Sequence, residues 1–326
     1  MGNNLGIILL VSALCLGLIG CNGKGGNAQQ TNDSQAERVS PEFSGDSALG
    51  YVAAQCEFGP RTMNSEAHDR CCEYLTAKFR QFGAEVTVQE GKAELFDGTP
   101  VDIKNIIAVF NKDSKKRIII SSHWDSRPWA DNEDDESLHD TPIDGANDGA
   151  SGVGILLEIA RQFQMKAPAI GVELICWDAE DSGSHGESST NSWCLGSQFW
   201  AMNHSVEGFR YEFGILLDMV GGQDTYFRRE TYSNYYAPNL VNSVWGTAQS
   251  LGYGKYFLNE DGGAVTDDHV PLIKSGISCI DIIGSNKDGS TFPDTWHTLQ
   301  DNINNIDKEV LTAVGQTVLE MVYKQE

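Results

Sequence analysis

The pattern of residues 117–157 restricts this chain to a small set of folds. Three isoleucines, Ile118 to Ile120, form a β-branched run that ends at His123-Trp124-Asp125. Such a run predicts a strand buried on both faces, as in a parallel sheet. The loop GANDG then precedes an apolar stripe of helical spacing over residues 153–159. Together they predict an α/β fold with ionisable side chains at the carboxyl end of a strand, where open α/β sheets bind ligands.

Further strands and helices are predicted to alternate along the chain. The predicted strands cover residues 84–90, 103–110, 117–121, 171–177, 214–217 and 278–283. The predicted helices cover residues 65–82, 193–203, 238–251 and 310–323. Ser65 and Gly83 are suited to cap the first of these helices. We expect the strands at 103–110 and 117–121 to pair with each other across a polar turn.

Length and charge narrow the class of protein. With 326 residues and 40% hydrophobic side chains, the chain can build one large α/β domain with a sizeable core. It carries 23 basic and 46 acidic side chains, which gives a net charge of −23. This balance makes nucleic acid an unsuitable partner and leaves no polybasic patch for anionic membranes. We expect a monomer.

The N-terminal segment is predicted to be an export signal. Residues 1–20 contain no charged side chain, and the apolar segment at 7–19 is too short to span a bilayer comfortably. It ends at Leu18-Ile19-Gly20-Cys21, which resembles the lipobox of bacterial lipoproteins, with an uncleaved anchor as the alternative. The prediction is a signal peptide at 1–20, a lipidated cysteine with a flexible tether at 21–45, and a folded domain at 46–326. The protein would then be lipid-anchored in a bacterial cell envelope and face the periplasm.

Six cysteines remain after Cys15 and Cys21 are set aside, and we expect them to be mostly buried free thiols. An exported protein can form disulfides, so a pairing of Cys56 with Cys71 or Cys72 stays open. No spacing of cysteine and histidine indicates a metal cluster.

Ionisable residues follow four of the predicted strands. His123 and Asp125 end one strand, Glu180 and Asp181 follow another, and the remaining two are followed by Asp218 and by Trp296-His297. Parallel strands would gather these groups, with Asp148 of GANDG, at one edge of the sheet. A single aspartate at a strand end is more often a helix cap or a surface residue. So many carboxylates around histidine would repel one another unless a cation neutralised them. Carboxylate oxygens and histidine nitrogens are ligands that suit zinc.

Several motifs, taken in order, resemble the zinc aminopeptidase superfamily: HWDS, GANDGASG, AED, LLDM and FPDTWHTLQDN. They most resemble its glutaminyl cyclase branch, including the bacterial members related to the animal enzymes. The likeness covers residues 50–326 and includes FGPR at 58–61 and KNIIAVFN at 104–111. It implies a single-domain, three-layer α/β/α sandwich with a mostly parallel, mixed central sheet.

The resemblance also implies a metal site. Asp148, Asp181 and His297 would hold one zinc ion per chain, and Glu180 would be the general acid/base. Members of the family often carry glutamate where this chain has Asp181, which is one methylene shorter.

The same resemblance implies further residues of the site. Asp218 and Asp267 match catalytic carboxylates whose hydrogen bonds organise the cyclase site. The histidine that the animal enzymes carry in the last strand is Asp281 here, so this part of the network differs. Phe292 and Trp296 are predicted to bind the substrate through an apolar wall.

These features predict an acyltransferase that converts the N-terminal glutamine of peptides and proteins to pyroglutamate and releases ammonia. Two alternatives stay open. A zinc aminopeptidase would bind two zinc ions, the second through His123 and Asp218, and Glu180 would activate water. A non-catalytic peptide-binding lipoprotein on a peptidase frame would have no need of the intact set of ionisable residues.

Overall fold

The computed structural model describes residues 38–185 and 191–325. The predicted signal peptide, Cys21 and most of the predicted tether lie outside the described residues. Within the described ranges, no helix has the length and apolar character needed to cross a membrane.

The predicted start of the domain at residue 46 is too late in the chain. Ser40 donates hydrogen bonds from its backbone N–H and its hydroxyl to Glu320 Oε2, at 2.9 and 2.6 Å. Phe43 is buried, and its ring packs over Gly315, which leaves room for it by lacking a side chain. The segment 39–44 is therefore held against the last helix and belongs to the folded domain.

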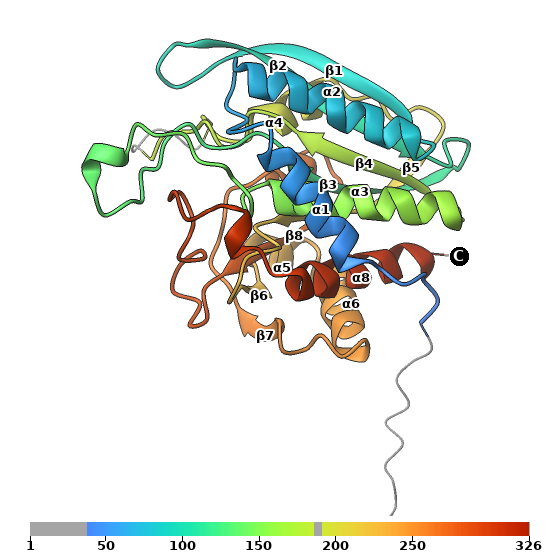
Figure 1. Cartoon of the computed structure of the whole chain (residues 1–326). Helices are drawn as coiled ribbons and strands as arrows, with labels where there is room; N and C mark the ends of the chain where they lie inside the picture. Colours follow the sequence, from blue (N-terminus) through green and yellow to red (C-terminus); the bar gives the residue numbers. More distant parts are fainter. Residues whose placement is uncertain (1–37, 186–190, 326) are drawn as a thin grey trace, which may run out of the picture. The chain divides into compact units, whose positions relative to one another are not determined.

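A single mixed sheet forms the centre of the described chain, with strand order β1-β2-β4-β3-β5-β8-β6-β7 (Figure 1). The strands are β1 (Glu85–Glu94), β2 (Pro100–Phe110), β3 (Lys116–His123), β4 (Gly171–Trp177), β5 (Arg210–Asp218), β6 (Tyr226–Arg229), β7 (Phe257–Asp261) and β8 (Cys279–Ser285). The helices are α1 (Gly45–Cys56), α2 (Glu66–Gln81), α3 (Ala150–Met165), α4 (Leu195–Asn203), α5 (Thr231–Tyr236), α6 (Pro238–Ser250), α7 (His269–Lys274) and α8 (Lys308–Tyr323), with short 3₁₀ helices η1 (Glu136–Leu138) and η2 (Ile303–Asn305).

The predicted pairing of the strands at 103–110 and 117–121 is wrong. β4 lies between β2 and β3, and it pairs antiparallel with β2 and parallel with β3. Ile118, Ile119 and Ile120 are fully buried, as is typical of an interior strand with parallel neighbours, and β3 lies between β4 and β5, both parallel to it. β5 in turn pairs parallel with β8, so four parallel strands share one carboxyl edge.

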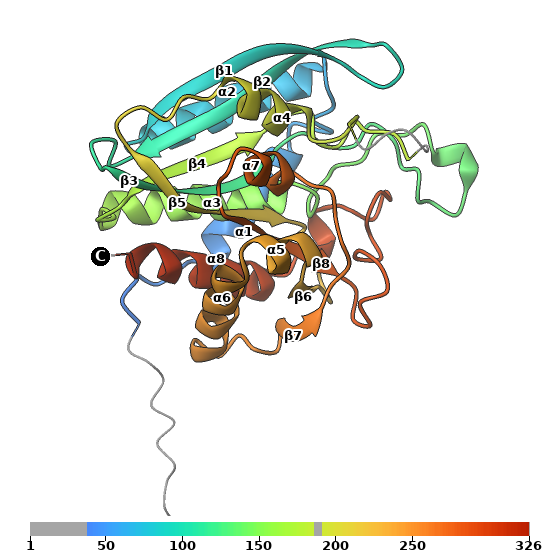
Figure 2. The same cartoon turned by 180° about the vertical axis from the view of Figure 1, so that it is seen from behind.

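Helices cover both faces of this sheet, which confirms the predicted three-layer α/β/α sandwich. Helices α1, α2, α3, α6 and α8 contribute to the larger core on one face (Figure 1), and α4 and α7 cover the other face (Figure 2). The isoleucines of β3 alternate between these layers: Ile118 and Ile120 face the larger core, and Ile119 faces the smaller one. Each contributes about 1.5–3 kcal/mol through burial.

The remaining predicted elements are confirmed in type, with ends that shift by a few residues. Ser65 caps α2 by accepting the N–H of His68, and Gly83 ends the helix with a positive φ of 94°. Local patterns did not predict the shorter elements α5, α7, β6 and β7, nor α1. The cysteines of the described chain are free thiols, so the open alternative of a Cys56 disulfide is not formed.

Candidate active site

The predicted site residues lie together at the carboxyl edge of the parallel strands. His123 ends β3 and Asp218 ends β5, whereas Glu180 and Asp181 follow β4 in a short loop. Asp148 precedes α3, and His297 comes from the long loop after β8. Two of the connecting residues, Ala179 and Met219, have positive φ angles of 51° and 49°. Such backbone costs about 1–3 kcal/mol per residue and is commonly found where a site requires it.

The first group of possible metal ligands consists of Asp148, Asp181 and His297. His297 Nε2 lies 3.2 Å from Asp181 Oδ1 and 3.8 Å from Asp148 Oδ2. All three side chains are buried, and their ligand atoms lie within 4.8 Å of one another. The structure therefore brings together the three residues that the resemblance assigned to zinc.

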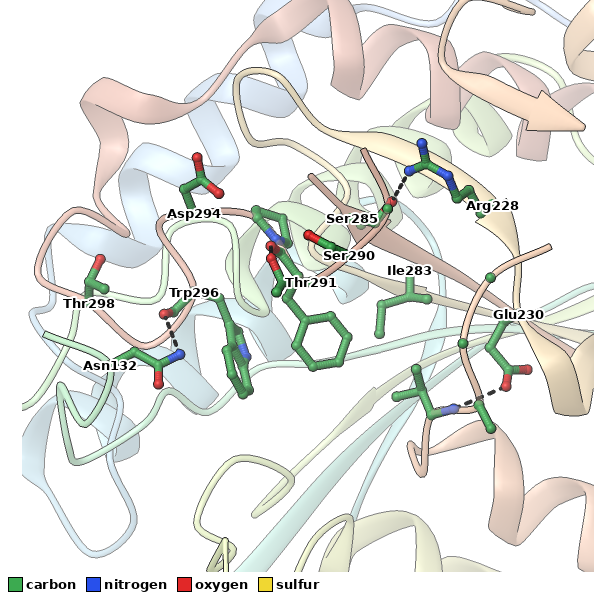
Figure 3. A pocket seen from close by; sticks show the side chains of 18 residues that line it. Asn132, Arg228, Glu230, Ile283, Ser285, Ser290, Thr291, Asp294, Trp296 and Thr298 are labelled. Atoms are coloured by element: carbon green, nitrogen blue, oxygen red, sulfur yellow. Dashed lines mark hydrogen bonds between the residues drawn. The ribbon is translucent and has the colours of Figure 1, made fainter. Parts of the chain in front are cut away.

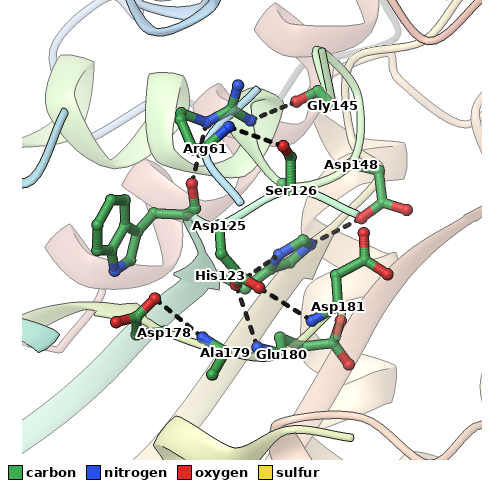
Figure 4. A network of polar contacts seen from close by, with 12 residues as sticks. Arg61, His123, Asp125, Ser126, Gly145, Asp148, Asp178, Ala179, Glu180 and Asp181 are labelled. Atoms are coloured by element: carbon green, nitrogen blue, oxygen red, sulfur yellow. Dashed lines mark hydrogen bonds and ion pairs between the residues drawn. The ribbon is translucent and has the colours of Figure 1, made fainter. Parts of the chain in front are cut away.

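A second group shares Asp148 with the first. His123 Nε2 lies 2.8 Å from Asp148 Oδ1 (Figure 4). It also lies 3.3 Å from Asp218 Oδ1. Burial and the nearby charge of Asp148 raise the pKa of Asp218 to about 8, although His123 opposes the shift. A cation between these three residues would relieve the same repulsion, so the geometry offers a second metal position.

The first group fits a zinc ion. Asp181 Oδ2 and Nε2 of His297 are buried without a hydrogen-bond partner in the described chain. Burial, followed by the charge of Asp148, raises the pKa of Asp181. The neighbouring cationic groups of the protein therefore do not fully balance the negative charge of this carboxylate. Two carboxylates and one imidazole are a donor set that zinc accepts, with a fourth position left for substrate.

Arg127 and Asp131 support this group from behind and were not predicted. Asp131 accepts hydrogen bonds from Arg127 Nε and Nη2 at 2.8 and 2.5 Å, and its Oδ1 lies 3.2 Å from His297 Nδ1. Arg127 also donates to the backbone carbonyl of Asp181 at 3.0 Å. In the sequence, Asp131 is one of many acidic residues in a polar loop, so only a four-residue spacing from Arg127 distinguishes it.

The loop that carries Glu180 and Asp181 is held by Asp125. Each oxygen of the Asp125 carboxylate accepts one backbone N–H, from Glu180 and from Asp181, both at 3.1 Å (Figure 4). His123 Nδ1 lies 3.5 Å from the same carboxylate. Asp125 therefore links the end of β3 to the two residues that the resemblance gives central roles.

Arg61 of the FGPR motif fixes the loop that leads to Asp148. Its guanidinium is fully buried and donates to the backbone carbonyls of Trp124, Asp144 and Gly145 (Figure 4). At the end of this loop, the backbone N–H groups of Asn147 and Asp148 donate to the distant Asp301 carboxylate at 2.6 and 3.1 Å. The position of Asp148 is thus set from both sides.

Glu180 contacts a thiol that the sequence gave no reason to choose. Cys194 Sγ donates to Glu180 Oε1 at 3.2 Å, and the Cys194 backbone N–H donates to the Glu180 carbonyl at 3.1 Å. Enclosure in the pocket raises the pKa of Glu180 well above its usual range; His123 opposes this shift, whereas Asp267 and Asp181 add to it. A carboxyl group with a raised pKa can both accept and return a proton near neutral pH.

Asp267 also lies close to Glu180. Its carboxylate, that of Glu180 and the thiol of Cys194 lie within 4.8 Å of one another, and a second buried group joins Asp267 to His269 and Asp281. Burial raises the pKa of Asp267 and raises that of Asp281 well above its usual range. Where the animal enzymes carry a histidine in the last strand, this chain therefore places the acidic side chain of Asp281 beside Asp267. The histidine of this group, His269, comes from the neighbouring helix.

A pocket of about 370 Å³ opens onto these residues. The metal group, Glu180, Asp218 and Asp267 line it. The rings of Phe292 and Trp296 form part of its wall, 4.7 Å apart between centroids, and Trp296 stacks on His297 at 3.8 Å. All residues predicted to act on substrate thus face one cavity.

Comparison with known proteins identifies the family. Residues 105–322 match peptidase family M28. The chain belongs to this family.

Among solved structures, this M28 chain is similar to a glutaminyl cyclase from Bacteroides thetaiotaomicron, with 48% identity, a TM-score of 0.85, and coverage of 88% of this chain and all of that chain. It is also similar to a Zn-dependent exopeptidase from Parabacteroides distasonis, with 49% identity, a TM-score of 0.84 and the same coverage. A glutaminyl-peptide cyclotransferase from Bos taurus is 26% identical over 65% of this chain, and the match spans only 63% of the bovine protein.

Proposed function

We propose that this M28 protein is a glutaminyl cyclase that converts N-terminal glutamine of peptides and proteins to pyroglutamate and releases ammonia. The observation that carries the proposal is the likeness to the Bacteroides cyclase over that whole chain. The pocket supports it, because Glu180, Asp267 and Trp296 surround one small cavity beside the metal group.

The chain's own residues can perform the proton transfers of this reaction. Glu180 would accept a proton from the α-amine as this amine attacks the γ-carbonyl carbon, and would return a proton to the departing amide nitrogen. Asp148, Asp181 and His297 would hold one zinc ion per chain, which supplies a Lewis acid for the γ-carbonyl oxygen. Trp296 and Phe292 would pack on the glutamine side chain and hold the amine near the carbon. Such positioning contributes on the order of 7–11 kcal/mol in favourable cases.

A zinc aminopeptidase is the second candidate. The group formed by His123, Asp148 and Asp218 favours it, because a second cation could bind there. The name of the Parabacteroides relative points the same way. In that reaction Glu180 would take a proton from water, and the product would be one residue shorter.

Mass spectrometry of a glutamine-initiated peptide separates the candidates. A cyclase removes only the mass of ammonia, whereas an aminopeptidase removes a whole residue, also from a matched leucine-initiated peptide. Cleavage of the leucine peptide without ammonia release from the glutamine peptide would refute the cyclase proposal. If neither peptide changes, the result favours the third alternative, a non-catalytic peptide-binding protein on a peptidase frame.

The site of action is a separate proposal. The Leu18 to Cys21 lipobox and the polar residues after it support a lipid anchor in a bacterial cell envelope, with the enzyme facing the periplasm. Stable anchoring requires at least two acyl chains or a comparable second signal. Native protein should therefore partition into detergent, and Cys21→Ser should remain in the aqueous phase. An unmodified Cys21 in native material would contradict the proposal.

A further inference from the structure

Two carboxylates hold the backbone of the loop that carries Glu180 and Asp181. Asp125 accepts the N–H groups of these two residues. Asp178, the first residue after β4, accepts the N–H of Ala179 on its Oδ1 at 2.9 Å (Figure 4). Ala179 has a positive φ, a conformation that persists only where the surrounding structure holds it. The conformation of this loop therefore depends on Asp178 as well as on Asp125.

Both oxygens of the Asp178 carboxylate accept backbone N–H groups. While Oδ1 binds Ala179, Oδ2 accepts the N–H of Lys104 in β2 at 2.7 Å. Protonation of either oxygen would place an O–H donor against a backbone N–H donor. The two hydrogen bonds therefore require Asp178 to be ionised. Because Asp178 is fully buried, its charge needs a cation beside it.

His68 of α2 supplies this cation. Its Nε2 lies 2.8 Å from Asp178 Oδ1, and both side chains are buried. Among the described residues, no other basic side chain lies within ion-pair distance of Asp178, since Lys104 Nζ pairs with Asp69 at 2.5 Å. Burial lowers the pKa of His68, but the charge and hydrogen bond of Asp178 outweigh this effect and raise the pKa above its usual value.

Trp124 fixes the ring of His68. The two rings stack with their centroids 4.2 Å apart. The indole N–H of Trp124 donates to the Lys104 carbonyl at 3.2 Å, and its backbone N–H donates to the Trp177 carbonyl at 3.0 Å. His68 thus reaches the end of β3 through Trp124 and the end of β4 through Asp178.

We propose that His68 is a positioning residue for Glu180 and Asp181, and that it acts through its ion pair with Asp178 at the start of their loop. The inference rests on the proposed function only for the roles of Glu180 and Asp181. Neither member of the ion pair lines the pocket with the metal group or the larger cavity of about 520 Å³ (Figure 3). Variants of the pair therefore leave the surfaces that contact substrate intact, so kcat and zinc affinity should fall while KM changes little.

Two variants break the ion pair from opposite sides. His68→Gln keeps an N–H donor but removes the positive charge, and Asp178→Asn removes the negative charge and one acceptor. Each should lower kcat by about 10- to 100-fold, as expected when a residue that orients a reacting group is lost. The double variant should be no less active than the weaker single variant, because both changes break the same pair.

Leu75→Ala is the matched control, since Leu75 is a fully buried residue of the same helix that belongs to the hydrophobic core. It weakens the packing of α2 without touching the ion pair and should keep the wild-type kcat. Denaturant unfolding of each variant shows that kcat is measured on folded protein.

Two further measurements do not depend on turnover. Competition with a chelator should show a zinc affinity about 10- to 100-fold lower in His68→Gln and Asp178→Asn, because Asp181 lies in the same loop. NMR titration of the His68 ring should give a pKa above the usual value near 6.5 in wild type. The pKa should be lower in Asp178→Asn, which removes the main interaction that raises it.

Several results would overturn the positioning role. These are wild-type kcat and zinc affinity in both single variants, losses of kcat that multiply in the double variant, and a His68 pKa that is unchanged in Asp178→Asn. Cleavage of a leucine-initiated peptide without ammonia release would instead overturn the cyclase. The same variants are then compared on that peptide, because Glu180 and Asp181 serve both reactions. If no peptide is turned over, zinc affinity and the His68 titration decide on the positioning role.

Discussion

Asp131 Oδ1 lies 3.2 Å from Nδ1 of His297, while Nε2 of the same ring faces Asp181 at 3.2 Å. A carboxylate at Nδ1 holds the proton on that atom and leaves Nε2 free to bind a metal ion. Arg127 fixes the carboxylate through two hydrogen bonds and also contacts the backbone of Asp181. Two of the three proposed ligands are therefore oriented by one ion pair that lies behind them.

Replacing Asp131 should weaken zinc binding without removing a ligand. Asp131→Ala is expected to lower zinc affinity by about 10- to 100-fold, because His297 loses the group that sets its tautomer and orientation. Asp131→Asn should fall between this variant and wild type. Competition with a chelator measures the affinity. Asp134→Ala, at an exposed position of the same loop, is the control, and equal affinities for Asp131→Ala and Asp134→Ala would contradict the role.

The number of zinc ions separates the two candidate metal groups. If the group of Asp148, Asp181 and His297 is the only one used, metal analysis should give one zinc per chain. His297→Ala should then lose the metal, and His123→Ala should keep most of it. Two zinc ions in wild type, with one lost in His123→Ala, would favour the aminopeptidase instead.

Strand ends made much of the site predictable. Parallel strands bring their carboxyl ends to one edge whatever their order, so His123, Glu180 and Asp218 could be grouped without knowing which strands are neighbours. The order itself depends on burial across the whole sheet, and the local polar turn at 111–113 suggested a false pairing.

Residues that act through loop conformation could not be predicted in this way. Cys194 reaches Glu180 because its own backbone has a φ of 58°, a left-handed conformation that no local pattern indicates for cysteine. Asp131 reaches His297 from a loop whose acidic residues are mostly exposed. Single-sequence patterns do not distinguish the one carboxylate that turns inward.

Glu230 should make the protein sensitive to acid. Burial alone would raise the pKa of Glu230, but the hydrogen bond and charge of His269, with the backbone N–H groups of Ser233 and Tyr232, lower it to about 2. A lowered pKa stabilises the folded state above the unfolded value near 4.5, and this stabilisation disappears as pH falls toward 2. The difference corresponds to about 3 kcal/mol of unfolding free energy.

Denaturant unfolding at several pH values measures this contribution. Glu230→Gln should be less stable than wild type at pH 6 to 7 by roughly this amount, and the two should converge as pH falls from about 4.5 to 2. Glu260→Gln, which removes an exposed carboxylate beside Arg228, should run parallel to wild type. A constant difference between Glu230→Gln and wild type at all pH values would contradict the assignment.

Glu180→Gln tests the proton transfers directly. The amide cannot accept a proton from the substrate amine, so kcat for ammonia release should fall by about 10²- to 10⁴-fold, the usual contribution of general acid/base catalysis. Zinc content should stay at the wild-type level because Glu180 is not assigned as a ligand. Undiminished ammonia release would remove Glu180 from the mechanism.

Cys194 should act as a positioning residue for Glu180. Its thiol donates to Glu180 Oε1 at 3.2 Å, and burial raises the pKa of this thiol well above its usual range, so it stays a donor. Cys194→Ala should lower kcat by about fivefold, which corresponds to the net worth of one hydrogen bond of about 1 kcal/mol. KM and zinc content should change little. Cys194→Ser should recover most of the lost activity because its hydroxyl can donate to the same oxygen. Cys72→Ala, at a buried thiol of α2, controls for the loss of a buried sulfur. If the serine variant is no more active than the alanine variant, the thiol serves packing alone.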